Sequence, residues 1–511
     1  MATQPNILVV IADQLAASGL GAYGNRLTRA PSLDRLATEG AVFEHAYCAS
    51  PLCVPSRGAL MTGMLPSRNG AYDNGAELAA SVPTFAHYLR VLGYRTVLAG
   101  KMHFVGPDQL HGFEERVTAD VYPGGLDWTP DWRLSETERL PWYHDMSSVE
   151  RAGPVRASLQ LDYDDEVAFR ARRAIVDTAR ARDGRPLLLV ASFTHPHDPY
   201  EVPQRLWESY ADALVDPPTV PTLPLDEQDA HSRRLLAMFE HDKHPVTPDR
   251  LIAARRAYSA AISLVDEHVA SLLATLDDVG LRDDTIVVVI ADHGDMLGER
   301  GLWYKMSFFE GSARVPLIVH HPASVSPARI SQPVSLLDIA PTLVELAGGW
   351  PDDAPAAPID GRSLVPLLAN DTGERAPVLG EYLSEGVTEP QVMVRHGRYK
   401  LIRCPGDPDL LYAMDEDPHE LDNLATEPRG IWALGELGAI ADARWDLAAL
   451  RRTVVASQEA RRLVVRALAT GRLTRWDRLV PDDGPDRYIS SGRDFWGALE
   501  QSRLPGDGSQ V

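Results

Sequence analysis

Four strand-sized apolar runs, each followed directly by polar side chains, constrain the fold of this chain more than any other feature. The runs cover residues 6–12, 95–100, 186–194 and 285–291. Uninterrupted β-branched and aliphatic residues predict strands that are covered on both faces, as in parallel sheets. Apolar residues at helical spacing occupy 164–182 and 248–279, and one of the runs follows each segment closely. We therefore expect an α/β sandwich with a mainly parallel central sheet.

The residues that follow these runs are the candidates for chemistry. The four runs lead into Asp13-Gln14, Lys101-Met-His103, His195-Pro-His197-Asp198 and Asp292-His293-Gly294-Asp295. Ligands of open α/β sheets bind beyond the carboxyl ends of the strands, so we expect these side chains to meet at one site. Lys101 and His103 are two residues apart in a segment that we expect to be extended, so they should face the same way.

The composition of the sequence changes near residue 350, where a segment rich in Pro, Ala and Asp precedes short alternating segments. This change predicts a second unit. We expect a main domain over 1–375, a smaller C-terminal α+β domain over 376–475 and an extended tail over 476–511. Short alternating segments at 392–403 and 410–414 predict antiparallel strands, and 444–473 has the pattern of one or two helices. The tail carries Phe495 and Trp496. We therefore expect it to dock at the active site or at a subunit interface.

Charge and composition exclude some classes of protein. With 50 Lys plus Arg against 72 Asp plus Glu, the net charge of −22 excludes a bulk electrostatic binder of nucleic acid. No apolar run approaches the about 18 residues of a membrane span. No basic segment precedes the first apolar run, and the three cysteines, Cys48, Cys53 and Cys404, cannot all pair. Both features favour a reducing compartment, so we expect a cytoplasmic protein.

The sharpest local motif is Cys53-Val-Pro-Ser-Arg57, followed by Thr62-Gly63. Proline near the first helical turn, with Ala, Leu and Met after it, places Cys53 at a helix N-terminus, where an anion is favoured. A small buried Cys would not account for the rest of the motif. The motif resembles that of type I sulfatases. This resemblance implies an alkaline-phosphatase-like fold and a Cys53 that a formylglycine-generating enzyme oxidises to an aldehyde, whose hydrate attacks the sulfur of the ester.

The resemblance also implies a metal site and a set of catalytic residues. The metal ligands would be Asp13, Gln14, Asp292, His293 and the oxygen derived from Cys53. Ca²⁺ is the expected ion, with Mg²⁺ next; Mn²⁺ stays open because imidazole suits borderline metals. In family terms the residues that bind sulfate or move protons are Arg57, Lys101, His103, His197 and Lys305.

Longer stretches resemble choline-sulfatases in particular, and this likeness runs from about residue 5 to the tail. The stretches are 100–108, 128–132, 142–145, 192–200, 292–314 and 380–386. A quaternary ammonium is recognised by aromatic faces and carboxylates. The resemblance places the choline end near Trp128, His144, Asp145, Glu385 and Asp494, with Asn74 nearer the sulfate. Asp145 stands where the family pattern has Asn. The family also implies a homo-oligomer, a dimer or a tetramer.

Three other functions stay open at this point. Phosphonate monoester hydrolases and phosphodiesterases share the CxPSR motif, the Gln and the His, but generally lack the Lys-x-His pair seen at Lys101 and His103. Another small alkyl or aryl sulfate could be the substrate. The chain could also be a non-catalytic binding protein, although the intact set of catalytic residues argues against it.

Overall fold

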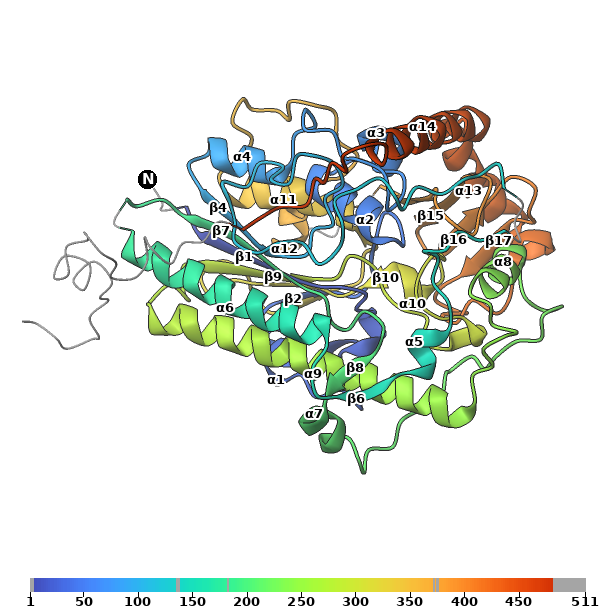
Figure 1. The fold of residues 1–511 in the computed structure, drawn as a ribbon, viewed down its shortest axis with the longest axis horizontal. Coiled ribbons are helices and arrows are strands. Elements are labelled where there is room, and N and C mark those ends of the chain that lie inside the picture. Colours follow the sequence, from blue (N-terminus) through green and yellow to red (C-terminus); the bar gives the residue numbers. More distant parts are fainter. Residues whose placement is uncertain (1–3, 135–137, 182, 371–372, 374–375, 481–511) are drawn as a thin grey trace, which may run out of the picture.

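The computed structural model describes residues 4–134, 138–181, 183–370, 373 and 376–480. An eight-stranded sheet crosses its centre in the order β12-β2-β11-β9-β1-β7-β4-β5 (Figure 1). The four predicted runs form its middle: β9 (Thr285–Ile290), β1 (Asn6–Ala12), β7 (Leu187–Phe193) and β4 (Arg95–Gly100). These strands are mutually parallel, so their carboxyl ends lie at one edge of the sheet, as predicted.

Shorter strands extend the sheet on both sides. β11 (Leu317–His320) runs antiparallel to β9 and to β2 (Ala41–Phe43), whereas β12 (Ala328–Ile330) is parallel to β2 and β5 (Glu115–Arg116) is parallel to β4. Two small ribbons lie outside the sheet: β3 (Ala46–Tyr47) with β10 (Arg314–Val315) and β13 (Val334–Ser335), and β6 (Gly153–Val155) with β8 (Glu201–Pro203).

Helices cover both faces of the central sheet (Figure 1). One face carries α1 (Pro31–Glu39), α6 (Leu159–Arg180) and α9 (Pro248–Asp278), and the other carries α2 (Cys53–Thr62), α4 (Phe85–Val91) and α11 (Ile339–Leu346). α9 has the length and apolarity of a membrane span, but 67% of its most apolar stretch is buried inside the protein. That burial is typical of a core helix.

The smaller C-terminal sheet is antiparallel, as predicted. It comprises β14 (Val378–Tyr382), β15 (Gln391–His396), β16 (Tyr399–Arg403) and β17 (Leu410–Ala413). α13 (Ile431–Arg444) packs against β15 and β16. α14 (Leu447–Leu468) then returns to the main domain, where its side chains bond to residues from the loops around α2 (Figure 1).

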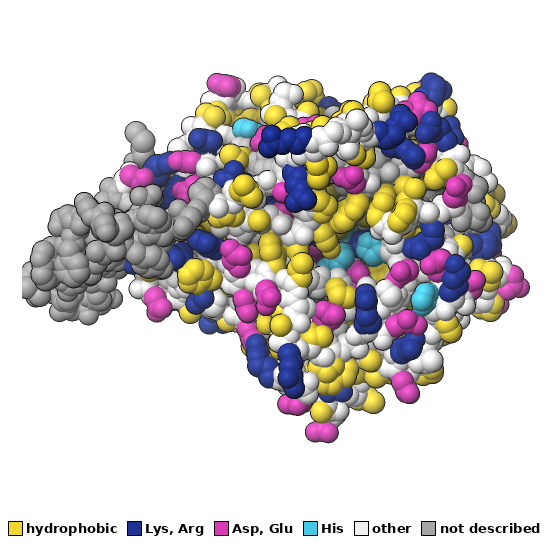
Figure 2. Space-filling view, viewed as in Figure 1, with side chains coloured by type: hydrophobic (Ala, Val, Ile, Leu, Met, Phe, Trp, Pro, Cys, Tyr) yellow, Lys and Arg dark blue, Asp and Glu magenta, His cyan; other side chains and the backbone are white. Residues whose placement is uncertain are grey.

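Short helices fill the connections: α3 (Pro66–Asn69), α5 (Ser147–Glu150), α7 (Gln204–Ser209), α8 (Ala230–Met238), α10 (Glu310–Ala313) and α12 (Val365–Leu368). Figure 2 shows histidine side chains near the middle of one face of the molecule, surrounded by hydrophobic side chains. The loops after the central strands meet in this region.

Candidate active site

Cys53 is the first residue of α2, at the helix N-terminus that the motif predicts. No side chain of its own segment caps this helix; instead Asn74 accepts a hydrogen bond from the backbone N–H of Val54 at 3.0 Å. The Cys53 sulfur lies 3.3 Å from Nε2 of His293 and 3.6 Å from Nζ of Lys101. The remaining free N–H groups and the helix dipole make this position favourable for an anion.

Two buried carboxylates, Asp13 and Asp292, lie beside Cys53, each with a cation. Asp13 pairs with Lys101, and Asp292 Oδ2 accepts a hydrogen bond from Nε of Arg57 at 2.8 Å. All four side chains are at most 1% exposed, and their charges cancel. Burial by itself would raise the pKa of Asp13, but the charges of Lys101 and Arg57 outweigh it and hold the pKa at about 2.

The donor set around Cys53 fits a hard or borderline divalent cation. Ligand atoms of Asp13, Cys53, Asp292 and His293 all lie within 4.8 Å of one another. Asp13 Oδ1 is buried and has no hydrogen-bond partner among the described residues. His293 Nδ1 lies 3.1 Å from the carbonyl of Gly294, which can only accept, so Nε2 turns its lone pair toward the cluster.

The side chain of Gln14, a predicted metal ligand, is held by hydrogen bonds at both ends of its amide. Its amide nitrogen donates to Asp295 at 2.6 Å, and its amide oxygen accepts from Lys305 at 2.8 Å. Because only the nitrogen of an amide can donate to the Asp295 carboxylate, this contact assigns the amide oxygen to the side that faces Lys305.

Lys305 forms a hydrogen-bonded cluster with two histidines. Its ammonium lies 2.8 Å from Nε2 of His197, 3.2 Å from Nε2 of His144 and 2.8 Å from the oxygen of Gln14. An ammonium has three N–H donors, so both imidazoles accept and are neutral. Burial, aided by the charge of Lys305, lowers the pKa of His144 to about 3 and that of His197 well below its usual value.

The segment after β4 differs from the prediction. His103 has a φ of 55°, in the left-handed region, so the backbone departs from extended geometry at this residue. The carboxylate of Asp120 accepts hydrogen bonds from the backbone N–H groups of Met102 and His103, at 3.1 and 2.8 Å. A carboxylate from a later loop thus holds the backbone that carries Lys101 and His103.

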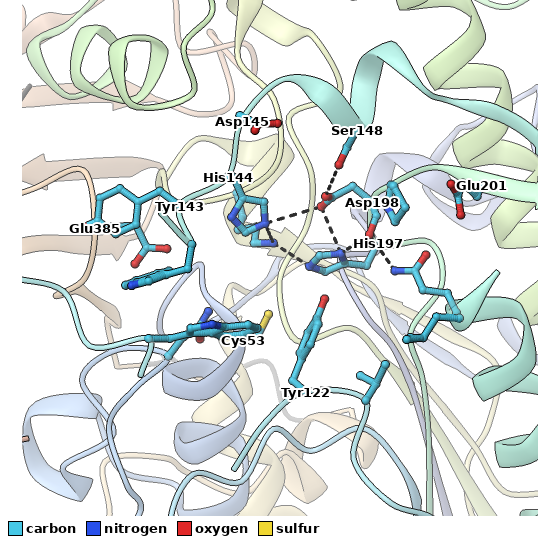
Figure 3. A pocket seen from close by; sticks show the side chains of 18 of the residues that line it. Cys53, Tyr122, Tyr143, His144, Asp145, Ser148, His197, Asp198, Glu201 and Glu385 are labelled. Carbon is cyan, nitrogen blue, oxygen red and sulfur yellow. Dashed lines mark hydrogen bonds and ion pairs between the residues drawn. The ribbon is translucent and has the colours of Figure 1, made fainter. Parts of the chain in front are cut away.

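A cavity of about 430 Å³ opens above Cys53 (Figure 3). Its aromatic wall is built by Tyr122, Trp128, Trp142 and Tyr143. Trp128 and Trp142 stack with ring centroids 6.3 Å apart, and Trp128 meets Tyr122 edge to face at 5.2 Å. The predicted residues that also line the cavity are Cys53, Asn74, His144, Asp145, His197, Lys305 and Glu385.

Glu385 brings a buried carboxylate to this wall. It is 1% exposed, Ser384 donates a hydrogen bond to Oε2, and Oε1 has no partner among the described residues. Burial raises its pKa from the ordinary value of 4.5 to about 6. Asp145, by contrast, accepts a hydrogen bond from the Ser147 N–H at 2.8 Å, and Figure 3 shows it above His144, away from Cys53.

One predicted site residue lies outside the described residues, and several residues of the site were not predicted. Asp494 and the rest of the tail beyond 480 belong to the first group. The second group comprises Tyr122, Trp142, Tyr143 and Asp120. Asp198, expected at the end of its strand, directly follows His197, and the ring of His197 lies 2.7 Å from its backbone oxygen. Tyr122 and Asp120 come from an irregular loop that shows no sequence pattern.

Comparison with known proteins shows to which family of enzymes this chain belongs. A model of the sulfatase family matches residues 5–349, and a model described as the choline sulfatase enzyme C terminal matches residues 452–503. The chain belongs to the sulfatase family and is an enzyme that hydrolyses sulfuric esters. It is 44% identical over 509 residues to the choline-sulfatase of Rhizobium meliloti, covering 98% of this chain and 99% of the relative.

More distant relatives share the fold. The arylsulfatase of Clostridium perfringens is 26% identical over 82% of this chain and 90% of its own length. The solved structure of a phosphonate monoester hydrolase from Silicibacter pomeroyi superposes with a TM-score of 0.69 at 23% identity, covering 86% of this chain and 95% of that one. The predicted alkaline-phosphatase-like fold is confirmed by these neighbours.

Proposed function

We propose that this sulfatase hydrolyses choline sulfate to choline and sulfate. The observation that carries the proposal is the buried Glu385 carboxylate on the aromatic wall of the cavity above Cys53, one oxygen of which has no partner in the described part of the chain. A quaternary ammonium donates no hydrogen bond and is bound by negative charge and aromatic faces. The likeness to the Rhizobium meliloti choline-sulfatase supports the same substrate.

The part of the cavity around Cys53 suits the sulfate group. Cys53 lies at a helix N-terminus, the ammonium of Lys101 lies 3.6 Å from the Cys53 sulfur, and Lys305 lines the cavity. Charge-assisted hydrogen bonds from such donors stabilise the negative charge that develops on the sulfate oxygens. A ligand that is anionic at one end and cationic at the other therefore matches the groups around Cys53 and the carboxylate of Glu385.

Lys305 and His197 are placed to handle the proton of the departing alcohol. In this proposal Nζ of Lys305 donates a proton to the hydrogen bond with Nε2 of His197, 2.8 Å away. Both side chains line the cavity, so either can pass that proton to the ester oxygen as the carbon–oxygen group leaves. The ring nitrogens of His103 are buried and have no partner among the described residues. We assign His103 to the proton transfer at residue 53 that follows departure of the alcohol and releases the sulfate.

We further propose a formylglycine at position 53 and a divalent ion held by Asp13, Gln14, Asp292 and His293. Formylglycine would supply the nucleophile as its hydrate, and the ion, when bound, would supply Lewis acidity. Ca²⁺ remains the expected ion, because three of the four proposed ligands offer oxygen. In this arrangement Arg57 orients Asp292 and Lys101 neutralises Asp13.

The first test compares three substrates on metal-replete protein whose Cys53 peptide has the mass of formylglycine. We expect kcat/KM for choline sulfate to exceed that for 4-nitrophenyl sulfate and for a phenylphosphonate monoester. Preference for the phosphonate would instead establish the alternative hydrolase function. Preference for the aryl sulfate would leave the sulfatase chemistry intact and refute the choline pocket.

The second test isolates the negative charge that we propose binds the ammonium group of the substrate. We expect Glu385→Gln to raise KM for choline sulfate roughly tenfold or more, because the ammonium loses a carboxylate partner, with little change for 4-nitrophenyl sulfate. Glu201→Gln is the matched control, since Glu201 lines the same cavity on the side opposite Glu385 (Figure 3). Equal effects of the two variants would show that only the overall charge of the cavity matters.

A further inference from the structure

A buried ion pair joins the C-terminal helix to the main domain beside the active site. Arg461, on α14, donates to both carboxylate oxygens of Asp73, at 2.6 and 2.7 Å. The Asp73 side chain is fully buried and that of Arg461 is 10% exposed. A bidentate pair of this kind fixes orientation as well as distance.

The same guanidinium also bonds to a second segment. Arg461 donates to the hydroxyl of Thr129 at 3.0 Å, and this hydroxyl in turn donates to the Leu126 carbonyl at 2.7 Å. The two segments touch through their backbones: a Cβ on Gly75 would lie 2.4 Å from the Thr129 nitrogen. Arg461 therefore lies where residues 73–75 and 126–129 meet, segments that are far apart in the sequence.

Each segment carries a residue of the proposed substrate pocket. Asn74, next to Asp73, lines the cavity and caps the helix that begins at Cys53. Trp128, next to Thr129, forms part of the aromatic wall. Displacement of the guanidinium would release both residues at once.

One turn earlier, the same helix face makes a parallel contact. Gln458, three residues before Arg461, accepts a hydrogen bond from the backbone N–H of Trp132 at 3.0 Å. The indole of Trp132 donates to the carbonyl of Ser384 at 2.8 Å, and Ser384 precedes Glu385. The contacts of α14 thus lead to Asn74, Trp128 and Glu385.

We propose that Arg461 is a positioning residue for the substrate pocket: through Asp73 and Thr129 it holds Asn74 and Trp128 at the distance from Cys53 that a small cationic sulfate ester requires. The inference rests on the proposed function for the identity of the ester. The link between α14 and the two loops does not depend on it.

The test uses a double variant of the full-length holoenzyme, Arg461→Met with Asp73→Asn, which removes both charges and leaves no unpaired buried ion. We expect the ratio of kcat/KM for choline sulfate to that for 4-nitrophenyl sulfate to fall about tenfold, mainly through KM for choline sulfate. Amide hydrogen exchange over residues 126–132 should accelerate. Arg461→Lys, which keeps the charge but not the fork, should give an intermediate ratio.

Arg451→Met is the matched control, because Arg451 lies on the same helix and pairs with Glu389 away from the cavity. We expect its selectivity and its exchange over 126–132 to match the wild type. An unchanged ratio and unchanged exchange in the double variant would overturn the proposal, as would an equal effect of Arg451→Met. If the wild type shows no preference for choline sulfate, the proposed function fails, whereas faster exchange in the double variant alone still supports the link.

Discussion

At the scale of single residues, the site is built from buried charges that differ in whether they are paired. Asp13 and Asp292 each have a cation, whereas Oε1 of Glu385 has no partner among the described residues. An unpaired buried carboxylate destabilises the folded state and is retained where a ligand supplies the missing charge. Glu385 therefore has opposite effects on stability and on substrate binding.

We predict that Glu385→Gln stabilises the free enzyme at neutral pH. Burial raises the pKa of Glu385 to about 6, so between its ordinary value of 4.5 and about 6 the folded state binds more protons than the unfolded state. Stability from this group is present below pH 4.5 and is lost as the pH rises through 6. The variant should be more stable than the wild type by about 2 kcal/mol at pH 7.5, with the difference vanishing near pH 4.5. Denaturant unfolding at the two pH values measures this, and a variant less stable at both would contradict it.

The same carboxylate should make substrate binding pH-dependent. A bound cation favours the ionised carboxylate, so protonation competes with choline sulfate, and KM for choline sulfate should rise as the pH falls through about 6. KM for 4-nitrophenyl sulfate serves as the control, because it has no cationic group and should not show this rise. In Glu385→Gln the additional rise for choline sulfate should disappear.

At the scale of elements, strand ends and helix N-termini position the chemistry, but loops complete it. β1, β4, β7 and β9 deliver their polar ends to one edge of the sheet, and α2 begins at Cys53. Their bounds follow from hydrophobic runs and could be predicted within a few residues. β14 escaped prediction because its short sequence, VLGEY, shows no alternation, yet it leads into Glu385.

We predict that Asp120 controls turnover through the segment that follows β4. Asp120→Ala removes the acceptor of two backbone N–H groups, which should displace Lys101 and His103 and lower kcat by about 100-fold. Asp120→Asn keeps an acceptor and should recover much of that loss. Asp108→Ala is the control: its carboxylate bonds the N–H groups of Leu110 and His111 in a nearby turn outside the cavity. Steady-state kinetics on folded variants checks this, and wild-type kcat in Asp120→Ala would refute the role.

At the scale of the whole molecule, the charges around Cys53 balance without a bound ion, because Lys101 and Arg57 neutralise Asp13 and Asp292. We therefore predict that chelation abolishes turnover but leaves the protein folded. Loss of an ion present at a hundred times its Kd removes about 3 kcal/mol of stability, which lowers Tm by only a few degrees in a chain of this size. Calorimetry and near-UV circular dichroism of the chelated protein check this, and restoring Ca²⁺, Mg²⁺ or Mn²⁺ in turn identifies the ion. Global unfolding on chelation would contradict the prediction.

The sequence by itself determined the class of fold and the reactive centre of this protein. Hydrophobic periodicity is a local property, so the parallel strands and the helix that begins at Cys53 could be predicted, and with them Asp13, Lys101, His197 and Asp292 at strand ends. Only the tertiary structure decided how these groups are held. Asp120, Tyr122 and Arg461 come from loops or from a distant helix, and their roles arise from contacts between segments that no local pattern connects. The burial that raises the pKa of Glu385 likewise depends on neighbours contributed by the whole fold.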